Sequence, residues 1–139
     1  MIKDAKIFLI IIIVVSSALL LSGCIATDTD NNEFDVIFSS DIVDLVEYDV
    51  EYNYDNNNNA NQINVNGRIS TKLDRIVNVS LLAKFYDKDN QYIGESNFNI
   101  FGLRPKGGPG SSTTFTIVFE GLEASLVEEI DLSAFEIER

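Results

Sequence analysis

From Phe34 onward, apolar and polar residues alternate with a period of two, the period of a β-strand that buries one face. In the first half of this region the alternation predicts strands at residues 34–38, 48–54 and 63–69. Each predicted strand has one apolar face and one largely polar face. This is the pattern of a sheet that meets a core on one side and water on the other.

The second half of the region continues the same pattern. Its clearest strand directs Val77, Val79, Leu81, Ala83 and Phe85 to one side. The turn sequence Asp87-Lys88-Asp89-Asn90 and a further extended stretch at 92–101 predict a hairpin. Two Pro and three Gly residues between 103 and 112 exclude a helix there and predict a second turn region. The last strands are expected at 113–119 and 130–137.

Two segments deviate from simple alternation. In the last strand the apolar phase slips between Leu132 and Phe135, which predicts a β-bulge. At residues 41–47 a short helix competes with a strand, because Ile42, Leu45 and Val46 would share one helical face.

About seven short strands separated by turns are typical of an all-β protein. We therefore expect an antiparallel immunoglobulin-like sandwich at residues 34–139, which would follow an N-terminal signal helix. A chain of 139 residues has room for one ordinary domain once the signal segment is subtracted.

The amino terminus has the composition of a signal peptide. Lys3 and Lys6 precede a dense apolar stretch at residues 7–21. A membrane-spanning helix needs about 20 apolar residues, so this stretch is short for a permanent anchor.

The stretch ends in Leu21-Ser22-Gly23-Cys24, which resembles the lipobox of prokaryotic lipoproteins. The resemblance implies cleavage after Gly23, a signal peptide at 1–23, and a lipid on the Cys24 thiol. That lipid would hold the mature protein on the extracytoplasmic face of the cell membrane. Two acyl chains are enough for stable anchoring. The alternative is an uncleaved anchor with an incidental cysteine.

Residues 24–33 are polar and acidic after Ile25, which predicts a solvated tether between the lipid and the domain. Asp28, Asp30 and Asn32 alternate like the start of a calcium-binding loop. However, Glu33 stands where such a loop requires Gly, so a solvated tether is the preferred interpretation.

Charge and composition narrow the function classes. The net charge of −12 opposes binding to phosphate backbones, so nucleic acid is not expected as a partner. The chain has no His and one Cys, which removes the commonest general base and any internal disulfide. No catalytic motif is present, so we expect neither an enzyme nor a cofactor. The Ile and Asn content fits an AT-rich prokaryotic genome, such as that of an archaeon.

Residues 79–94, with the turn at 103–108 and the extended stretch at 113–119, resemble the FxLYD family of immunoglobulin-like domains, which occur in bacterial and archaeal extracytoplasmic lipoproteins. The resemblance is carried by Tyr86-Asp87 at the end of an aromatic strand, by Ile93-Gly94, and by the Pro-Gly turn that follows. Ala83 and Phe85 stand at the motif's leading Phe and its Leu. The resemblance implies a fold and a location but no catalytic residues.

Several polar features are candidate sites. Asp87, Asp89 and Glu95 bracket the predicted hairpin turn and could supply oxygen ligands to a cation, although Asp also stabilises turns by bonding its own backbone. Residues 55–62 form an Asn-rich segment that could contact a carbohydrate through amides. A mobile polar loop without an aromatic platform is the preferred interpretation.

Two further features concern the strands. Tyr48, Tyr52 and Tyr54 form a stripe at strand spacing, which indicates either core or a recognition surface. Asn78-Val79-Ser80 is an N-glycosylation sequon, and the alternation places Asn78 on the outward face of its strand.

Taken together, these features predict a surface-tethered accessory or interaction module. Its partners would be the membrane, through the lipid on Cys24, and a protein or envelope polymer bound by a sheet face or edge strand. The alternative is a lipoprotein that binds a small molecule or cation for uptake.

Overall fold

The computed structural model describes residues 34–138. The chain divides into residues 1–31 and residues 32–139, and the described residues all lie in the second part. The predicted signal peptide, and with it the signal helix and the tether, therefore lie outside the described part of the chain.

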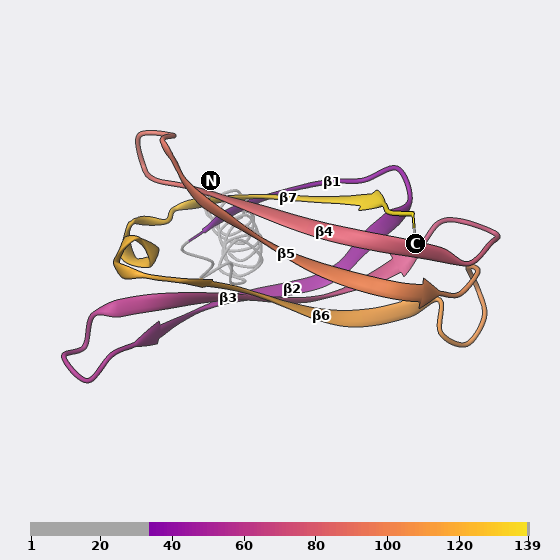
Figure 1. Ribbon diagram of the computed structural model, residues 1–139, viewed down its shortest axis with the longest axis horizontal. Coiled ribbons are helices and arrows are strands. Elements are labelled where there is room, and N and C mark those ends of the chain that lie inside the picture. The colour runs from indigo at the N-terminus through magenta and orange to yellow at the C-terminus, as the bar shows by residue number, and fades with distance from the viewer. Residues whose placement is uncertain (1–33, 139) are drawn as a thin grey trace, which may run out of the picture. The chain divides into compact units, whose positions relative to one another are not determined.

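The described residues form seven β-strands and one short 3₁₀ helix (Figure 1). In chain order the strands are β1 Asp35–Ser39, β2 Val43–Tyr54, β3 Ala60–Thr71, β4 Val77–Tyr86, β5 Tyr92–Leu103, β6 Ser112–Glu120 and β7 Glu129–Glu136, and the helix η1 Leu122–Leu126 stands before β7. Sheet A has the order β1-β7-β4-β5 and sheet B the order β2-β3-β6. The predicted all-β sandwich of about seven strands is confirmed.

The sandwich has one parallel pair. β1 runs parallel to β7, with Val36 opposite Ile130, while the other strand pairs are antiparallel. β1 and β7 are the first and the last strand of the domain, and after β1 the chain crosses directly into sheet B. The strand order therefore differs from that of an immunoglobulin constant domain, although the division into four and three strands is the same.

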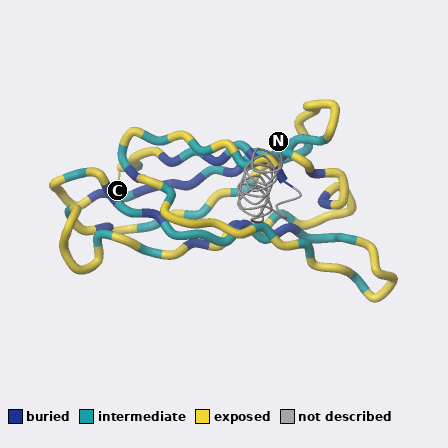
Figure 2. Tube along the Cα trace, turned by 180° about the vertical axis from the view of Figure 1, so that it is seen from behind, coloured by how far each residue is buried: buried dark blue, intermediate teal, exposed yellow. Residues whose placement is uncertain are grey.

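The core lies between the two sheets and is built from alternate residues of the strands. Its fully buried side chains are Val43, Ile63, Val65, Ile69, Val77, Val79, Leu81, Phe85, Ile117, Val127, Ile130 and Leu132. Figure 2 shows this alternation as short buried stretches within the strands, whereas the turns are exposed. The inward set predicted for residues 77–85 is confirmed, and it forms the centre of sheet A.

Within residues 41–47 a strand forms rather than the competing helix, and the bulge predicted in the last strand is wrong. Residues 43–47 belong to β2 rather than to a helix, and a register shift between Leu45 and Glu47 places Val46 outside the core. The bulge predicted in the last strand is absent from the β4–β7 register, which is continuous over residues 129–136. Phe135 breaks the apolar phase because its side chain points away from the core, whereas the side chain of Ala134 points into it.

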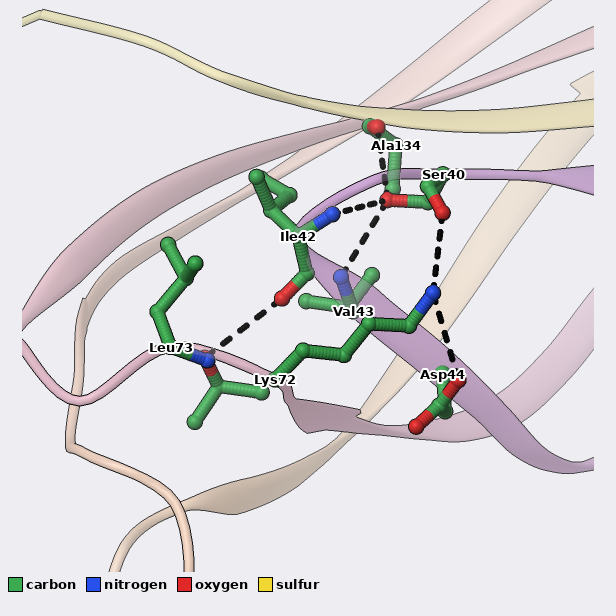
Figure 3. A network of polar contacts seen from close by, with 8 residues as sticks. Ser40, Ile42, Val43, Asp44, Lys72, Leu73 and Ala134 are labelled. Atoms are coloured by element: carbon green, nitrogen blue, oxygen red, sulfur yellow. Dashed lines mark hydrogen bonds and ion pairs between the residues drawn. The ribbon is translucent and has the colours of Figure 1, made fainter.

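The chain passes from sheet A to sheet B at residues 40–42, and the Ser40 hydroxyl holds this corner (Figure 3). Ser40 Oγ donates to the carbonyl of Ala134 in β7 at 2.9 Å. It also accepts hydrogen bonds from the backbone N–H groups of Ile42 and Val43, each at 3.2 Å. Lys72 Nζ contacts the Ser40 carbonyl at 3.0 Å and the Asp44 carboxylate at 3.4 Å. One hydroxyl therefore links the two sheets.

We expect Ser40→Ala to lower the free energy of unfolding by about 1 to 2 kcal/mol, because the change leaves two backbone donors without their acceptor. Urea denaturation followed by circular dichroism measures this loss. The control is Ser39→Ala, since Ser39 is the exposed last residue of β1. Equal stability of the two variants would show that the corner does not depend on the hydroxyl.

A bidentate ion pair ties the loop before β4 to the end of β7. Arg75 Nη1 and Nη2 donate to the two carboxylate oxygens of Glu136 at 2.6 and 2.7 Å. These hydrogen bonds, with the charge of Arg75, hold the pKa of Glu136 below its ordinary value of 4.5. A lowered pKa in the folded state stabilises the fold above the unfolded value, and this stabilisation is lost as pH falls through the folded value.

We therefore expect Glu136→Gln to lower the urea midpoint at pH 7 but not at the lowest pH at which the domain still folds. The difference between wild type and variant should shrink as pH falls below 4.5. Glu138→Gln is the matched control, because Glu138 forms no ion pair within residues 34–138. A pH-independent difference would mean that packing, rather than charge, accounts for the effect.

Candidate functional site

The residues of the predicted lipid anchor lie outside the described part of the chain. This holds for Leu21, Ser22, Gly23 and Cys24, and also for the calcium-like residues Asp28, Asp30 and Asn32. Within residues 34–138, no helix is long and apolar enough to span a membrane. Lipid attachment at Cys24 therefore stays a prediction.

The hairpins β2–β3 and β4–β5 have turns of the same type. Asp87 Oδ1 accepts hydrogen bonds from the backbone N–H groups of Asp89 and Gln91 at 2.8 and 2.9 Å. Asp55 Oδ1 accepts from Asn57 and Asn59 in the same positions, at 2.8 and 2.9 Å. In each turn an Asn takes the left-handed conformation, Asn58 with φ 63° and Asn90 with φ 58°. In both turns, an Asp side chain thus accepts backbone hydrogen bonds and an Asn three residues later adopts a positive φ.

Two of the three candidate cation ligands, Asp87 and Glu95, have hydrogen-bond partners within their own hairpin. One oxygen of Asp87 is engaged by the backbone, and Glu95 Oε2 accepts from the hydroxyl of Tyr92 at 3.2 Å. Among the described residues, no group of three acidic, His or Cys side chains is placed to hold a metal ion. In the other hairpin, hydrogen bonds from the backbone N–H groups of Asn59 and Asn57 lower the pKa of Asp55. The carboxylates of Asp87 and Asp55 therefore each accept backbone hydrogen bonds within their own turn.

The structure divides the tyrosine stripe. Tyr52 packs on Phe34 with ring centroids 4.9 Å apart, and its hydroxyl donates to the carbonyl of Val127 at 2.9 Å. Tyr48 and Tyr54 are exposed. Tyr52 thus closes one end of the core, while the other two rings are available on the surface.

Asn78 lies in β4 next to an irregularity in the β4–β5 pairing. The register shifts between Val77 and Val79, so that Phe101 and Gly102 of β5 together lie opposite Asn78. Asn78 Oδ1 accepts a hydrogen bond from the Gly102 N–H at 2.9 Å. Asn78 is half-buried between the buried residues Val77 and Val79, so it lies on the outer side of its strand, as the alternation predicts. Glycosylation of Asn78 stays a prediction.

The outer face of sheet A is divided into a charged half and an uncharged half. Toward the β4–β5 turn, the register places Asp131, Lys84 and Glu95 side by side on β7, β4 and β5. The other half carries no charged side chain in the described strands. We call it the sheet A patch, formed by Asn78, Ser80, Leu82, Asn97, Asn99, Phe101, Ser133 and Phe135.

Two aromatic rings project from the sheet A patch. Phe101 is 58% exposed and Phe135 is 46% exposed. Between them in the sheet lies Ser80, which the register places beside both Phe135 and Asn99. Ser80 is only 5% exposed, so its larger neighbours cover it. Acidic residues outnumber basic ones more than two to one over residues 34–138, which makes an uncharged face with two exposed rings distinctive.

The sequence alone did not reveal this patch. The alternation of Asn97, Asn99 and Phe101 was visible, but nothing local shows that β5 lies beside β4, or β4 beside β7. One signal in the sequence was the phase slip at Phe135, which indicates an outward aromatic residue as well as it indicates a bulge.

Sheet B carries a second candidate site, a shallow groove of about 370 Å³. We call it the sheet B groove, lined by Glu47, Tyr48, Asp49, Asn66, Gly67, Thr114, Phe115 and Thr116 from all three strands. Thr116 Oγ1 donates to Asn66 Oδ1 at 2.9 Å. Arg68 Nε lies 3.2 Å from Glu47 Oε1 but is not aligned for a hydrogen bond. The groove therefore offers carboxylate, amide and hydroxyl groups beside one exposed tyrosine.

Comparison with known proteins gives no relative from which a site can be transferred. No protein-family model, curated protein or solved structure matches the chain.

Proposed function

We propose that this protein is a lipid-anchored interaction module of the extracytoplasmic membrane face. The lipobox-like residues Leu21 to Cys24 and the polar tether support the location. The partial resemblance to FxLYD domains supports it as well, since Tyr86 ends β4, Asp87 begins the turn, and Ile93-Gly94 lies in β5. In this proposal the lipid retains the protein at the membrane, and the sandwich is free to bind.

The observation that carries the proposal is the sheet A patch. Two exposed phenylalanine rings on one uncharged face leave apolar surface in water that a partner would bury. The patch lies on a sheet face away from the hairpin turns, and its amides and hydroxyls can supply directional contacts around the two rings. These properties fit a binding face better than a solvated surface, which in this acidic domain would be expected to carry charges.

Two measurements on the full chain test the proposal. Intact mass of protein from native membranes should equal the chain from Cys24 onward plus a lipid, and Cys24→Ser should leave the membrane fraction. Detergent-solubilised protein should co-sediment with delipidated envelopes of the native host, and Phe101→Ala with Phe135→Ala should abolish this. An unprocessed chain would refute the proposed location. Envelope binding that the double substitution leaves unchanged would refute the proposed binding face.

The sheet B groove supports a second candidate function, the binding of a small molecule or cation. Its carboxylates Glu47 and Asp49 and its amide and hydroxyl groups suit a cationic or polyhydroxylated ligand. A ligand at 100 times its dissociation constant should add about 2.7 kcal/mol to the free energy of unfolding. Thermal unfolding with and without calcium, sugars or polyamines measures this, with Asp49→Asn as the variant that should lose the shift. No shift across the panel would exclude this function.

A further inference from the structure

The chemistry of the sheet A patch identifies the class of partner that fits it. Its polar groups around the two rings are four side chains that are neutral at any physiological pH, Asn78, Asn97, Asn99 and Ser133. Each amide presents both donors and an acceptor, and the serine hydroxyl also donates and accepts. A ligand rich in hydroxyl groups matches such a surface, because each hydroxyl has the same two capacities.

The two phenylalanines add a geometric condition. Phe135 on β7 and Phe101 on β5 are separated by β4. Phe135 lies opposite Ser80 and Phe101 lies beside Asn78, so the two differ in level by two residues of β4. Two strand spacings and two residue steps place their Cα atoms about 12 Å apart. This separation is comparable with the length of a disaccharide unit. Two rings at such a spacing can stack on the apolar faces of alternate sugars of one extended chain.

Charge selects against other polymers. Acidic residues outnumber basic ones in the domain, so polyanionic polymers would be repelled. A polycation would be drawn to the acidic remainder of the surface, where β2 carries Asp44, Glu47, Asp49 and Glu51, rather than to the uncharged patch. The same acidity opposes close association of two copies of the chain.

We infer that the sheet A patch binds a neutral polysaccharide, with Phe101 and Phe135 stacking on sugar rings and the Asn side chains bonding sugar hydroxyls. The inference rests on the proposed function, which it deepens by naming the polymer class. The polymer lies across β7, β4 and β5, so the two phenylalanine rings that anchor it stand on one sheet.

Affinity electrophoresis of the full chain in non-ionic detergent tests this inference. Native gels contain hydroxyethylcellulose, glucomannan or dextran, and polygalacturonate serves as the charged comparison. At least one neutral polysaccharide should retard the wild type. Phe101→Ala with Phe135→Ala should weaken the affinity about tenfold or more, since two stacking contacts are lost. Polygalacturonate should retard neither protein.

Two controls keep the result interpretable. Tyr54→Ala removes an exposed ring outside the patch and should leave retardation unchanged. Thermal unfolding of the double variant shows whether it folds, and Asn97→Asp with Asn99→Asp offers a second test that keeps both rings and introduces charge. These charged variants should also lose retardation.

The outcomes separate this inference from the proposed function. If no neutral polysaccharide retards the wild type while envelope binding still depends on both phenylalanines, the polysaccharide inference is overturned and the interaction module stands. If polysaccharide retardation and phenylalanine-dependent envelope binding are both absent, the polysaccharide inference and the interaction module are both overturned. A dimer in sedimentation velocity that the double substitution dissociates, without polysaccharide retardation, would assign the patch to a second copy of the chain and also overturn the inference.

Discussion

Phe85→Ala is expected to lower the free energy of unfolding by about 3 to 5 kcal/mol, more than the loss expected for Ser40→Ala at the corner between the sheets. Phe85 is fully buried in β4, at the centre of sheet A. Its ring stacks on Phe119 of β6 with centroids 4.7 Å apart, so the pair joins the two sheets. Removing the ring leaves a cavity that two facing sheets cannot easily close.

Denaturation by guanidinium chloride, followed by circular dichroism, measures this loss. The matched control is Phe101→Ala, the same chemical change at an exposed position, which should cost about 0.5 kcal/mol or less. A domain of this size has a total stability of about 5 to 15 kcal/mol, so the Phe85 variant should be unfolded by much less denaturant. If the two variants have the same midpoint, the Phe85–Phe119 contact does not hold the sandwich together.

Gly67→Ala is expected to cost about 1 to 3 kcal/mol, although alanine is usually favoured over glycine within a strand. A Cβ at position 67 would lie 2.6 Å from Cζ of Phe115 and 2.8 Å from the carbonyl oxygen of Glu47. The first atom can move only by displacing a core ring. The second is backbone at the register shift of β2, so the strand itself would have to move.

Urea denaturation measures the cost, and Gly108→Ala is the control. At Gly108 the nearest atom to an added Cβ is the Pro105 carbonyl oxygen, 3.8 Å away, so stability should stay constant or rise slightly. Adding Phe115→Leu to Gly67→Ala should lessen the incremental cost of the alanine, because the smaller side chain yields space. Wild-type stability of Gly67→Ala would contradict the close packing of β2, β3 and β6.

Most strands were predictable because their alternation is unbroken. In β4 the inward set from Val77 to Phe85 is entirely apolar, and the Asp87 turn supplies its own hydrogen bonds, so strand and hairpin are both encoded locally. At residues 43–47 the alternation is broken by a register shift. There the pairing of Val43 with Thr71 and of Leu45 with Ile69 decides for a strand, and both partners are distant in sequence.

The candidate sites were less predictable than the strands. The sheet A patch combines residues of β4, β5 and β7, so it exists only after these strands have paired. Similarly, alternation predicts that a polar residue such as Asn78 faces solvent, but its hydrogen bond to Gly102 depends on the irregular register of β4 with β5.

By itself, the sequence determined the class of the domain, the approximate positions of its strands, and the turn at residues 87–90 that joins β4 to β5. These depend on side chains within a few residues of one another, and alternation and turn preferences reflect such contacts directly. Only the tertiary structure decided that β1 runs parallel to β7, that Phe135 faces outward without a bulge, and that Phe101 joins it on one uncharged face. The physical reason is that strand order and register arise from contacts between segments far apart in the chain, which no local pattern contains.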